Sequence, residues 1–166
     1  MELDHKGDDR GFFARLFCEE EFAAHGLATH ITQINTSYSA ARGTLRGLHF
    51  QRPPKAEAKV VRCLKGAIFD VLVDLRPGPN LGNHHAAELT DDNRSMLYIP
   101  EGCAHGFQTL TDDAELLYFH SESYAPDLEG GVHYADPAIG IDWPLPPLNV
   151  SARDQKFPRL ADLEPL

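Results

Sequence analysis

Residues 46–51 (RGLHFQ) place Arg46, His49 and Gln51 within one short strand-like run. The inward positions of a strand usually carry aliphatic side chains, whereas this run offers a permanent cation, a titratable base and an amide. Histidine has a reference pKa of about 6.5, so its side chain can take up and release a proton near neutral pH. Gly47 leaves room between the polar side chains. The combination is typical of a site that holds an anionic substrate and moves a proton.

Several carboxylates in the sequence could orient the His49 ring. A carboxylate that is hydrogen-bonded to one ring nitrogen fixes the tautomer and raises the basicity of the other nitrogen. Asp70, Asp74, Asp154 and other carboxylates are candidates for this partner, and the residue pattern does not choose among them.

Lys59 and Tyr118 are candidates for the remaining steps of a proton transfer, and each also has an ordinary structural interpretation. Lys59 opens the apolar run 59–64, where a lysine is usually a strand-end charge in solvent. If it points inward, its ammonium group could stabilise a developing oxyanion. Tyr118 lies in the apolar run 116–119, so composition alone favours a core tyrosine with a hydrogen-bonded hydroxyl.

The nine histidines raise the question of a metal site. Such a site needs two or three imidazoles and a carboxylate that converge on one ion. The usual His-x-His signature is missing from residues 49–51, where Gln51 replaces the second imidazole. His84 and His85 would point to opposite faces of a strand, and His105 alone completes no ligand set, so we predict no metal. The other histidines are interpreted as surface or turn residues: His5, His25, His30, His120 and His133.

The charge balance argues against two classes of partner. The chain has 15 lysines and arginines against 25 acidic residues, a formal net charge of −10. Such a surface repels nucleic acid and anionic membranes, and we predict neither as a partner. An anionic ligand must therefore be held by a few well-placed cations.

Length and cysteine usage set the class of protein. A chain of 166 residues with 42% hydrophobic content predicts one globular domain over residues 1–166. Cys18, Cys63 and Cys103 lack CxxC spacing and are odd in number, which indicates buried thiols in a reducing cytoplasm. The first ten residues are charged and no apolar run is long enough to span a bilayer. We therefore expect a cytoplasmic protein without a signal peptide.

Short apolar runs with frequent turn signals predict an all-β fold. One short helix is expected over residues 19–24, with Gly26 as its stop, after an irregular polar start. Eight strands separated by proline and glycine turns favour a double-sheet jelly roll or a barrel, with one or two short helices. The last forty or so residues are expected to form a wrapped tail. The predicted strands cover residues 31–39, 44–50, 59–64, 67–75, 86–89, 95–99, 105–110 and 115–120.

Strand alternation brings some of the polar candidates together and separates others. Gln33 and Asn35 share one face of the run 31–39. Strict alternation puts Arg46 and His49 on opposite faces of their strand. A bulge at Gly47 would bring both side chains into one pocket.

An ordered set of motifs from about residue 8 to residue 158 resembles the dTDP-4-dehydrorhamnose 3,5-epimerases and related nucleotide-sugar epimerases. Any one of these motifs alone is weak, and the ordered set is specific. The matching segments are 8–13 (DDRGFF), 33–39, 44–51 (TLRGLHFQ), 59–62 (KVVR), 66–71, 74–76, 99–107 (IPEGCAHGF), 115–118, 124–126 (YAP), 136–144 and 151–154.

The resemblance implies a cupin-like jelly roll that forms a homodimer and works without metal or other cofactor. The implied reaction inverts carbons beside the keto group of a nucleotide-linked 4-keto-6-deoxyhexose, for cell-surface polysaccharide or a decorated natural product. A C–H bond next to a carbonyl is acidified because its carbanion is an enolate. One group removes the proton and another returns a proton from the opposite face.

The resemblance also implies a role for each matching residue. His49 matches the base, Asp154 its paired carboxylate, and Tyr118 the proton donor. Lys59 matches the residue near the keto oxygen. Arg10 matches an arginine that reaches the phosphates, often across the dimer, and Tyr124 an aromatic residue beside the nucleobase. The implied substrate-binding residues are Arg10, Phe13, Gln33, Asn35, Arg46, His105 and Tyr124.

Two departures from the family pattern concern the nucleobase and the sugar. Arg15 stands where many members have glutamate, and residues 81–84 (LGNH) replace a Phe-Gly-x-Trp motif. The leading hypothesis is an epimerase acting at C3 and/or C5. The alternatives are a catalytically silent nucleotide-sugar-binding domain and a metal-dependent cupin enzyme.

Overall fold

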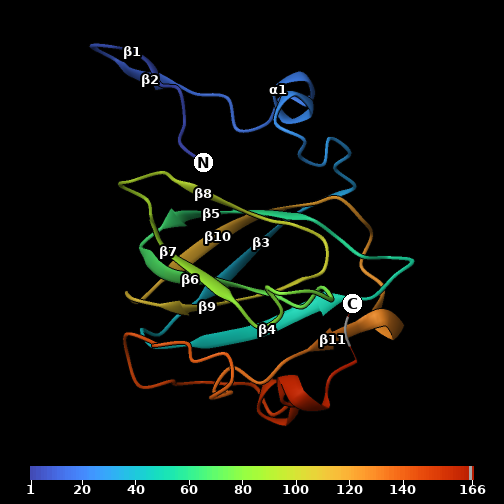
Figure 1. The fold of residues 1–166 in the computed structure, drawn as a ribbon. Helices are drawn as coiled ribbons and strands as arrows, with labels where there is room; N and C mark the ends of the chain where they lie inside the picture. The colour runs from blue at the N-terminus through green and yellow to red at the C-terminus, as the bar shows by residue number, and fades with distance from the viewer. Residues whose placement is uncertain (165) are drawn as a thin grey trace.

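Two antiparallel sheets face each other in the computed structural model, which describes residues 1–164 and 166. Figure 1 shows a four-stranded sheet above a five-stranded one. The four-stranded sheet has the order β3 (Gln33–Ser39), β10 (Ala114–His120), β5 (Lys59–Lys65), β8 (Met96–Ile99). The five-stranded sheet has the order β11 (Glu129–Gly131), β4 (Leu45–Gln51), β9 (Cys103–Thr109), β6 (Ala67–Asp74), β7 (His84–Thr90).

The predicted all-β double-sheet architecture is confirmed. All eight predicted strands are present, with ends that differ by no more than two residues from those observed. The helix α1 (Glu19–Ala24) ends before Gly26, as predicted. Three short 3-10 helices also occur: η1 (Pro126–Leu128), η2 (Asp154–Lys156) and η3 (Leu160–Asp162).

The prediction of an irregular start was wrong, and the tail contains a strand that was not predicted. β1 (Lys6–Asp8) and β2 (Gly11–Phe13) form a hairpin whose turn is held by the Asp8 carboxylate, which accepts the backbone N–H of Arg10 at 2.9 Å. β11 pairs with the end of β4. Each of these strands has three residues, too few to show a period-two pattern.

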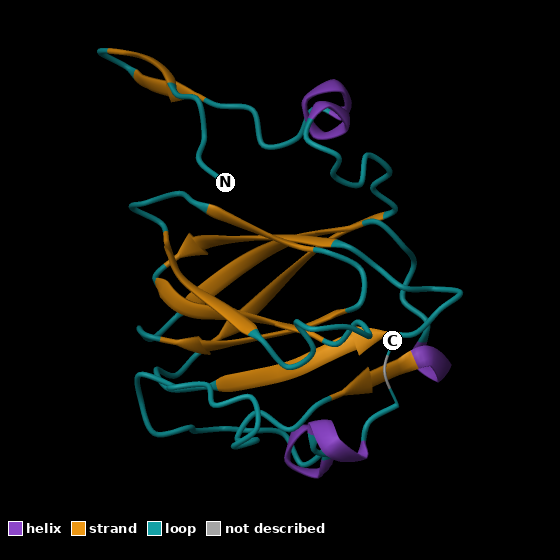
Figure 2. Ribbon diagram, in the orientation of Figure 1, coloured by secondary structure: helices purple, strands orange, loops and turns teal. Residues whose placement is uncertain are grey.

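The five-stranded sheet is buried on both faces. Ile68, Leu89 and Phe107 belong to the core between the sheets. On the other face, Val71 and Val73 of β6 pack against the C-terminal tail, which Figure 2 shows below the five-stranded sheet. Because side chains on both faces must be apolar, residues 67–75 read as an almost continuous hydrophobic run.

A bulge in β4 positions the central polar residues. The register against β9 shifts between Arg46 and His49, so the bulge that the sequence left as a possibility at Gly47 is present. Gly47 has φ +119°, and a Cβ atom there would lie 2.6 Å from the Cα of Gly106 on β9. Only glycine fits this close approach, and the extra residue brings Arg46 and His49 to the same cavity.

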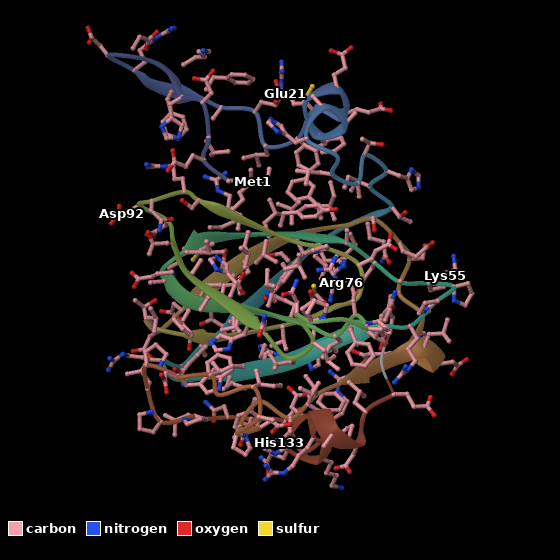
Figure 3. The ribbon with its side chains drawn as sticks, viewed as in Figure 1. Met1, Glu21, Lys55, Arg76, Asp92 and His133 are labelled. Atoms are coloured by element: carbon pink, nitrogen blue, oxygen red, sulfur yellow. The ribbon has the colours of Figure 1, made fainter. Side chains whose placement is uncertain are left out.

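The N-terminal segment lies outside the four-stranded sheet. Phe22 of α1 packs with Val60, Met96 and Phe119 on the outer face of that sheet. Figure 3 labels Met1 and Glu21 in this region, far from His133 in the tail. Among the described residues, no helix has the length and apolar character needed to cross a membrane.

Candidate active site

A polar cavity lies between the two sheets, at the open end where β4 finishes. It has two adjoining lobes of about 170 and 240 Å³. Asn35, His49, Lys59 and His120 line both lobes. Side chains from both sheets therefore surround one space.

His49 and Asp154 form a buried pair at the wall of this cavity. His49 Nε2 lies 2.9 Å from Asp154 Oδ1, and the backbone N–H of Gly47 donates to Oδ2 at 3.0 Å. Burial opposes ionisation of Asp154, but the hydrogen bonds from His49 and Gly47 outweigh it and hold the pKa of this carboxyl well below its ordinary value. An ionised Asp154 accepts Nε2–H of a neutral His49 and leaves Nδ1 available to a substrate.

The C-terminal tail places Asp154 beside His49, which lies 105 residues earlier in the chain. Asp154 opens η2, where its N–H donates to Ser151 Oγ at 3.0 Å. Two other candidate carboxylates have different partners: Asp70 lies 2.6 Å from His105 Nε2, and Asp74 pairs with Arg76. The structure thus selects Asp154 from the carboxylates that the sequence left open.

His105 forms a second histidine–carboxylate pair deeper between the sheets. Its side chain is 7% exposed and that of Asp70 is fully buried. His105 lines the larger lobe together with Arg46 and Tyr118.

The Tyr118 hydroxyl faces the cavity although its ring packs against the core. The hydroxyl lies 3.0 Å from Ser37 Oγ, and the ring contacts that of His105 edge-on. Burial raises the pKa of the Tyr118 phenol well above its ordinary value, and the Ser37 hydrogen bond only partly offsets this. Tyr118 is therefore a neutral hydroxyl that can donate a proton into the larger lobe.

Lys59 points inward, where Glu57 holds it. Its Nζ lies 3.0 Å from Glu57 Oε1, and Glu57 Oε2 lies 2.9 Å from His120 Nδ1. Burial disfavours the Glu57 carboxylate, but its hydrogen bonds with His120 and Lys59 hold its pKa below the ordinary value. The cavity thus contains a buried Lys59–Glu57–His120 group in which the environment favours the ionised form of Glu57.

The prediction that His120 is a surface or turn residue was wrong. His120 is the second residue after Tyr118 on β10, so alternation places both side chains on the inner face of the sheet. That spacing could have identified it. Glu57 precedes β5 in an irregular segment, where no periodicity marks an inward side chain.

Four of the implied substrate-binding residues line the two lobes of the cavity. The Arg46 guanidinium donates to Ser39 Oγ and to the Tyr38 carbonyl. Gln33 Oε1 accepts the backbone N–H of Tyr124 at 2.5 Å, and the Tyr124 ring is at the rim, where the residue is 58% exposed. The residues are Gln33, Asn35 and Tyr124 at the smaller lobe and Arg46 at the larger.

Arg10 and Phe13 are not brought to the cavity of their own chain. Both lie on the β1–β2 hairpin, which Figure 1 shows projecting above the four-stranded sheet. The Arg10 side chain is 89% exposed and pairs with Asp8, and Phe13 is 71% exposed.

Arg153 and Glu129 flank the His49–Asp154 pair and were not predicted from the sequence. Arg153 NH2 lies 3.1 Å from His49 Nε2, and NH1 donates to Glu129 Oε2 at 2.7 Å. Glu129 also accepts the Tyr124 hydroxyl at 2.9 Å. Polar contacts therefore connect the rim of the cavity to His49, through residues that lie far apart in the sequence.

A second, larger cavity lies outside the two sheets. A mainly apolar cavity of about 680 Å³ lies between the N-terminal segment, α1 and β8, on the side of the four-stranded sheet that faces away from His49. It lacks the convergent polar groups of the smaller cavity. Within residues 1–164 and 166, no three His, Cys, Asp or Glu side chains converge as metal ligands would.

The profile of the family described as dTDP-4-dehydrorhamnose 3,5-epimerase matches residues 1–162. The chain belongs to this family. The dTDP-4-dehydrorhamnose 3,5-epimerase of Sinorhizobium fredii is 43% identical over 159 residues, 95% of this chain and 82% of that protein. The dTDP-4-dehydrorhamnose 3-epimerase of Streptomyces niveus is 42% identical over 161 residues, 96% of this chain and 77% of that protein.

A solved structure shows the same fold. The dTDP-6-deoxy-D-glucose-3,5-epimerase of Legionella pneumophila, in complex with dTDP-4-keto-L-rhamnose, has a TM-score of 0.91 at 36% identity, covering 98% of this chain and 87% of that one. The comparisons confirm the predicted family, its isomerase class and the cupin-like fold. In this member of the epimerase family, the cavity combines a histidine–carboxylate pair, a neutral phenol and an ammonium group.

Proposed function

We propose that this protein epimerises a dTDP-linked 4-keto-6-deoxyhexose at C3 and C5. The observation that carries the proposal is that His49 and Tyr118 face one cavity from different sheets, with Lys59 on its wall. Inversion of a carbon requires a base on one face and an acid on the other. Relatives with more than 40% identity bear the name of this activity.

In this mechanism, His49 Nδ1 removes the proton from a carbon beside the keto group. Asp154 keeps the proton of the neutral ring on Nε2 and stabilises the imidazolium that forms. The electron pair moves into the enolate, whose oxygen is held by the Lys59 ammonium group. Tyr118 returns a proton from the opposite face, and the carbonyl re-forms.

The nucleotide part is assigned to polar residues around the mouth of the cavity. Arg46 supplies a guanidinium for the diphosphate, and His105 faces the sugar. Gln33 and Asn35 supply amides at the smaller lobe, where the exposed ring of Tyr124 suits a nucleobase. We further propose a homodimer in which Arg10 and Phe13 reach the partner's cavity, because the hairpin points away from their own.

The experiment is incubation with dTDP-4-keto-6-deoxyglucose in heavy water, followed by NMR of the sugar. Deuterium at both C3 and C5 together with the inverted product supports the proposal. No exchange with this or related nucleotide sugars would contradict it and would favour a catalytically silent binding domain.

A second candidate is an epimerase that acts at C3 alone. The relative from Streptomyces niveus, at 42% identity, is named a 3-epimerase. One base can serve either carbon if the sugar is held in a different pose, so His49 and Tyr118 fit both activities. Deuterium confined to C3 in the same experiment would select this narrower activity.

A further inference from the structure

His120 and Glu57 form a third histidine–carboxylate pair on the cavity wall, apart from the pairs of His49 and His105. His120 Nδ1 lies 2.9 Å from Glu57 Oε2, and the side chains of the two residues are 16% and 9% exposed. Nothing in the mechanism above uses this pair. A purely structural role would not require an imidazole ring at a position that lines both lobes of the cavity.

The Glu57 carboxylate fixes how the His120 ring presents its second nitrogen. Glu57 accepts a hydrogen bond from Nδ1–H, and the same carboxylate neutralises Lys59 at 3.0 Å. The ring is thereby oriented with Nε2 directed away from Glu57. No hydrogen bond from another described residue reaches Nε2, and this atom is not sealed from solvent. His120 thus offers one nitrogen that is free to exchange a proton.

Tyr118 and His120 lie side by side, across the cavity from His49. They are neighbours on the inner face of β10, and their rings stack with centroids 5.9 Å apart and planes inclined by 28°. His49 projects from β4 in the opposite sheet. A ring held between the sheets would therefore meet one base on one side and two proton-bearing groups on the other.

We propose that His120, oriented by Glu57, is a second proton donor, which serves one of the two inverted carbons while Tyr118 serves the other. This inference rests on the proposed epimerase function. C3 and C5 are bonded to the keto carbon C4 from either side, so two donors that lie side by side can each serve one of these carbons. A separate donor can then stand opposite His49 in each of the two poses that bring C3 and C5 to this base.

The proton-return step balances as follows at the carbon that His120 serves. The Nε2–H bond of the imidazolium breaks and a C–H bond forms with the electron pair of the enolate. The carbonyl re-forms at C4 and leaves Lys59. His120 then carries its remaining proton on Nδ1, towards Glu57, and takes up another proton from water at Nε2 through the partly exposed side of the ring.

The test compares wild type with His120→Gln, Tyr118→Phe and Glu57→Gln in heavy water, with dTDP-4-keto-6-deoxyglucose as substrate. Deuterium content and configuration are followed by NMR at C3 and C5 separately. His30→Gln is the matched control, because His30 is an exposed histidine outside the cavity. Binding of dTDP, measured by calorimetry, verifies that each variant is folded. If glutamine at position 120 prevents folding, His120→Asn replaces it.

We expect His120→Gln to slow inversion at one carbon by about 100-fold or more, which is the range of a general acid, and to leave the other carbon nearly unchanged. Tyr118→Phe should slow inversion at the other carbon. Glu57→Gln should slow inversion at both carbons, because Glu57 also holds Lys59. Inversion should slow more strongly at the carbon that His120 serves. Deuterium wash-in with retained configuration should persist at the affected carbon, because His49 still forms the enolate.

Three results would overturn the inference. The first is that His120→Gln inverts both carbons at the wild-type rate. The second is that His120→Gln loses the same fraction of the inversion rate at both carbons. The third is wild-type protein that inverts only one carbon, because a single donor then suffices. If the wild-type protein neither exchanges nor inverts the sugar, the proposed function fails together with this inference. If wild type is active and His120→Gln inverts both carbons at the same rate, only the inference fails.

Discussion

His49 has one ring nitrogen committed to Asp154, so the chemistry depends on the other nitrogen. His49→Asn keeps a polar side chain of similar size but removes the basic nitrogen. We expect exchange at every carbon to fall by about 10²–10⁴-fold, because proton removal precedes every later step. Heavy-water NMR measures the exchange, and calorimetry with dTDP should show that binding persists. Substantial deuterium uptake by this variant would remove His49 as the base.

Asp154 should also make a pH-dependent contribution to stability. Its pKa in the folded protein lies below the unfolded value of about 3.9, so folding favours the ionised form. This contribution is fully present above the unfolded pKa and is lost as the pH falls towards the folded pKa.

The corresponding variant is Asp154→Asn, which cannot ionise. We expect wild type to have the higher thermal midpoint at pH 7, and the difference to shrink between pH 5 and pH 3. Thermal unfolding followed by circular dichroism at a series of pH values measures it. A difference that stays constant down to pH 3 would mean that the hydrogen bonds do not depend on the Asp154 charge.

At the scale of elements, the strands could be predicted because most of them carry a short apolar run that is bounded by turn residues. The apolar runs within residues 59–64 and 115–120 locate β5 and β10 within two residues of their ends. The β1–β2 hairpin and β11 could not be located in this way, since strands of three residues have no measurable period. The bulge in β4 was predictable only as a possibility: its signal is a single glycine between two polar candidates, and the pairing with β9 decides it.

The bulge should be sensitive to any side chain at Gly47. Gly47→Ala would place a Cβ atom 2.6 Å from the Gly106 Cα and 2.8 Å from the His105 carbonyl oxygen, at a φ of +119°. We expect a loss of about 2–4 kcal/mol in the free energy of unfolding, because two backbones cannot separate without breaking the sheet. Urea denaturation measures the loss.

Gly78→Ala is the matched control for this substitution. Gly78 also has a positive φ, +143°, but no atom lies within 4 Å of the added Cβ. Gly78→Ala should lower the free energy of unfolding by a smaller amount, which is the cost of backbone strain alone. Equal losses in the two variants would show that conformation, rather than the contact with β9, makes Gly47 necessary.

At the scale of the whole molecule, the site depends on contacts that local patterns do not encode. Asp154 reaches His49 across 105 residues because the tail folds back beneath the five-stranded sheet. The sequence named the right carboxylate through the family resemblance, whereas spacing alone left several candidates. Glu57, Glu129 and Arg153 escaped prediction, because each lies outside a long strand and is placed only by tertiary packing.

The proposed homodimer, in which the β1–β2 hairpin of each subunit reaches the cavity of the other, makes a prediction about mixed dimers. Arg10 lies on a hairpin that points away from its own cavity, and His49 lies within that cavity. If Arg10 completes the partner's site, Arg10→Ala should weaken substrate binding in the homodimer and His49→Asn should abolish turnover. A mixed dimer would then contain one cavity with both defects and one cavity with none.

Coexpression of the two variants with different tags should therefore restore activity that neither has alone. Random pairing gives about half mixed dimers with one intact site each, so about a quarter of wild-type activity is expected. His49→Asn paired with Asp154→Asn is the matched control, since both residues belong to the cavity of one chain and every mixed site keeps one defect. If the mixture of Arg10→Ala and His49→Asn is only as active as the sum of the separate variants, Arg10 lies outside the partner's cavity. If activity is restored in this mixture and not in the control mixture, a second copy of the chain completes the cavity.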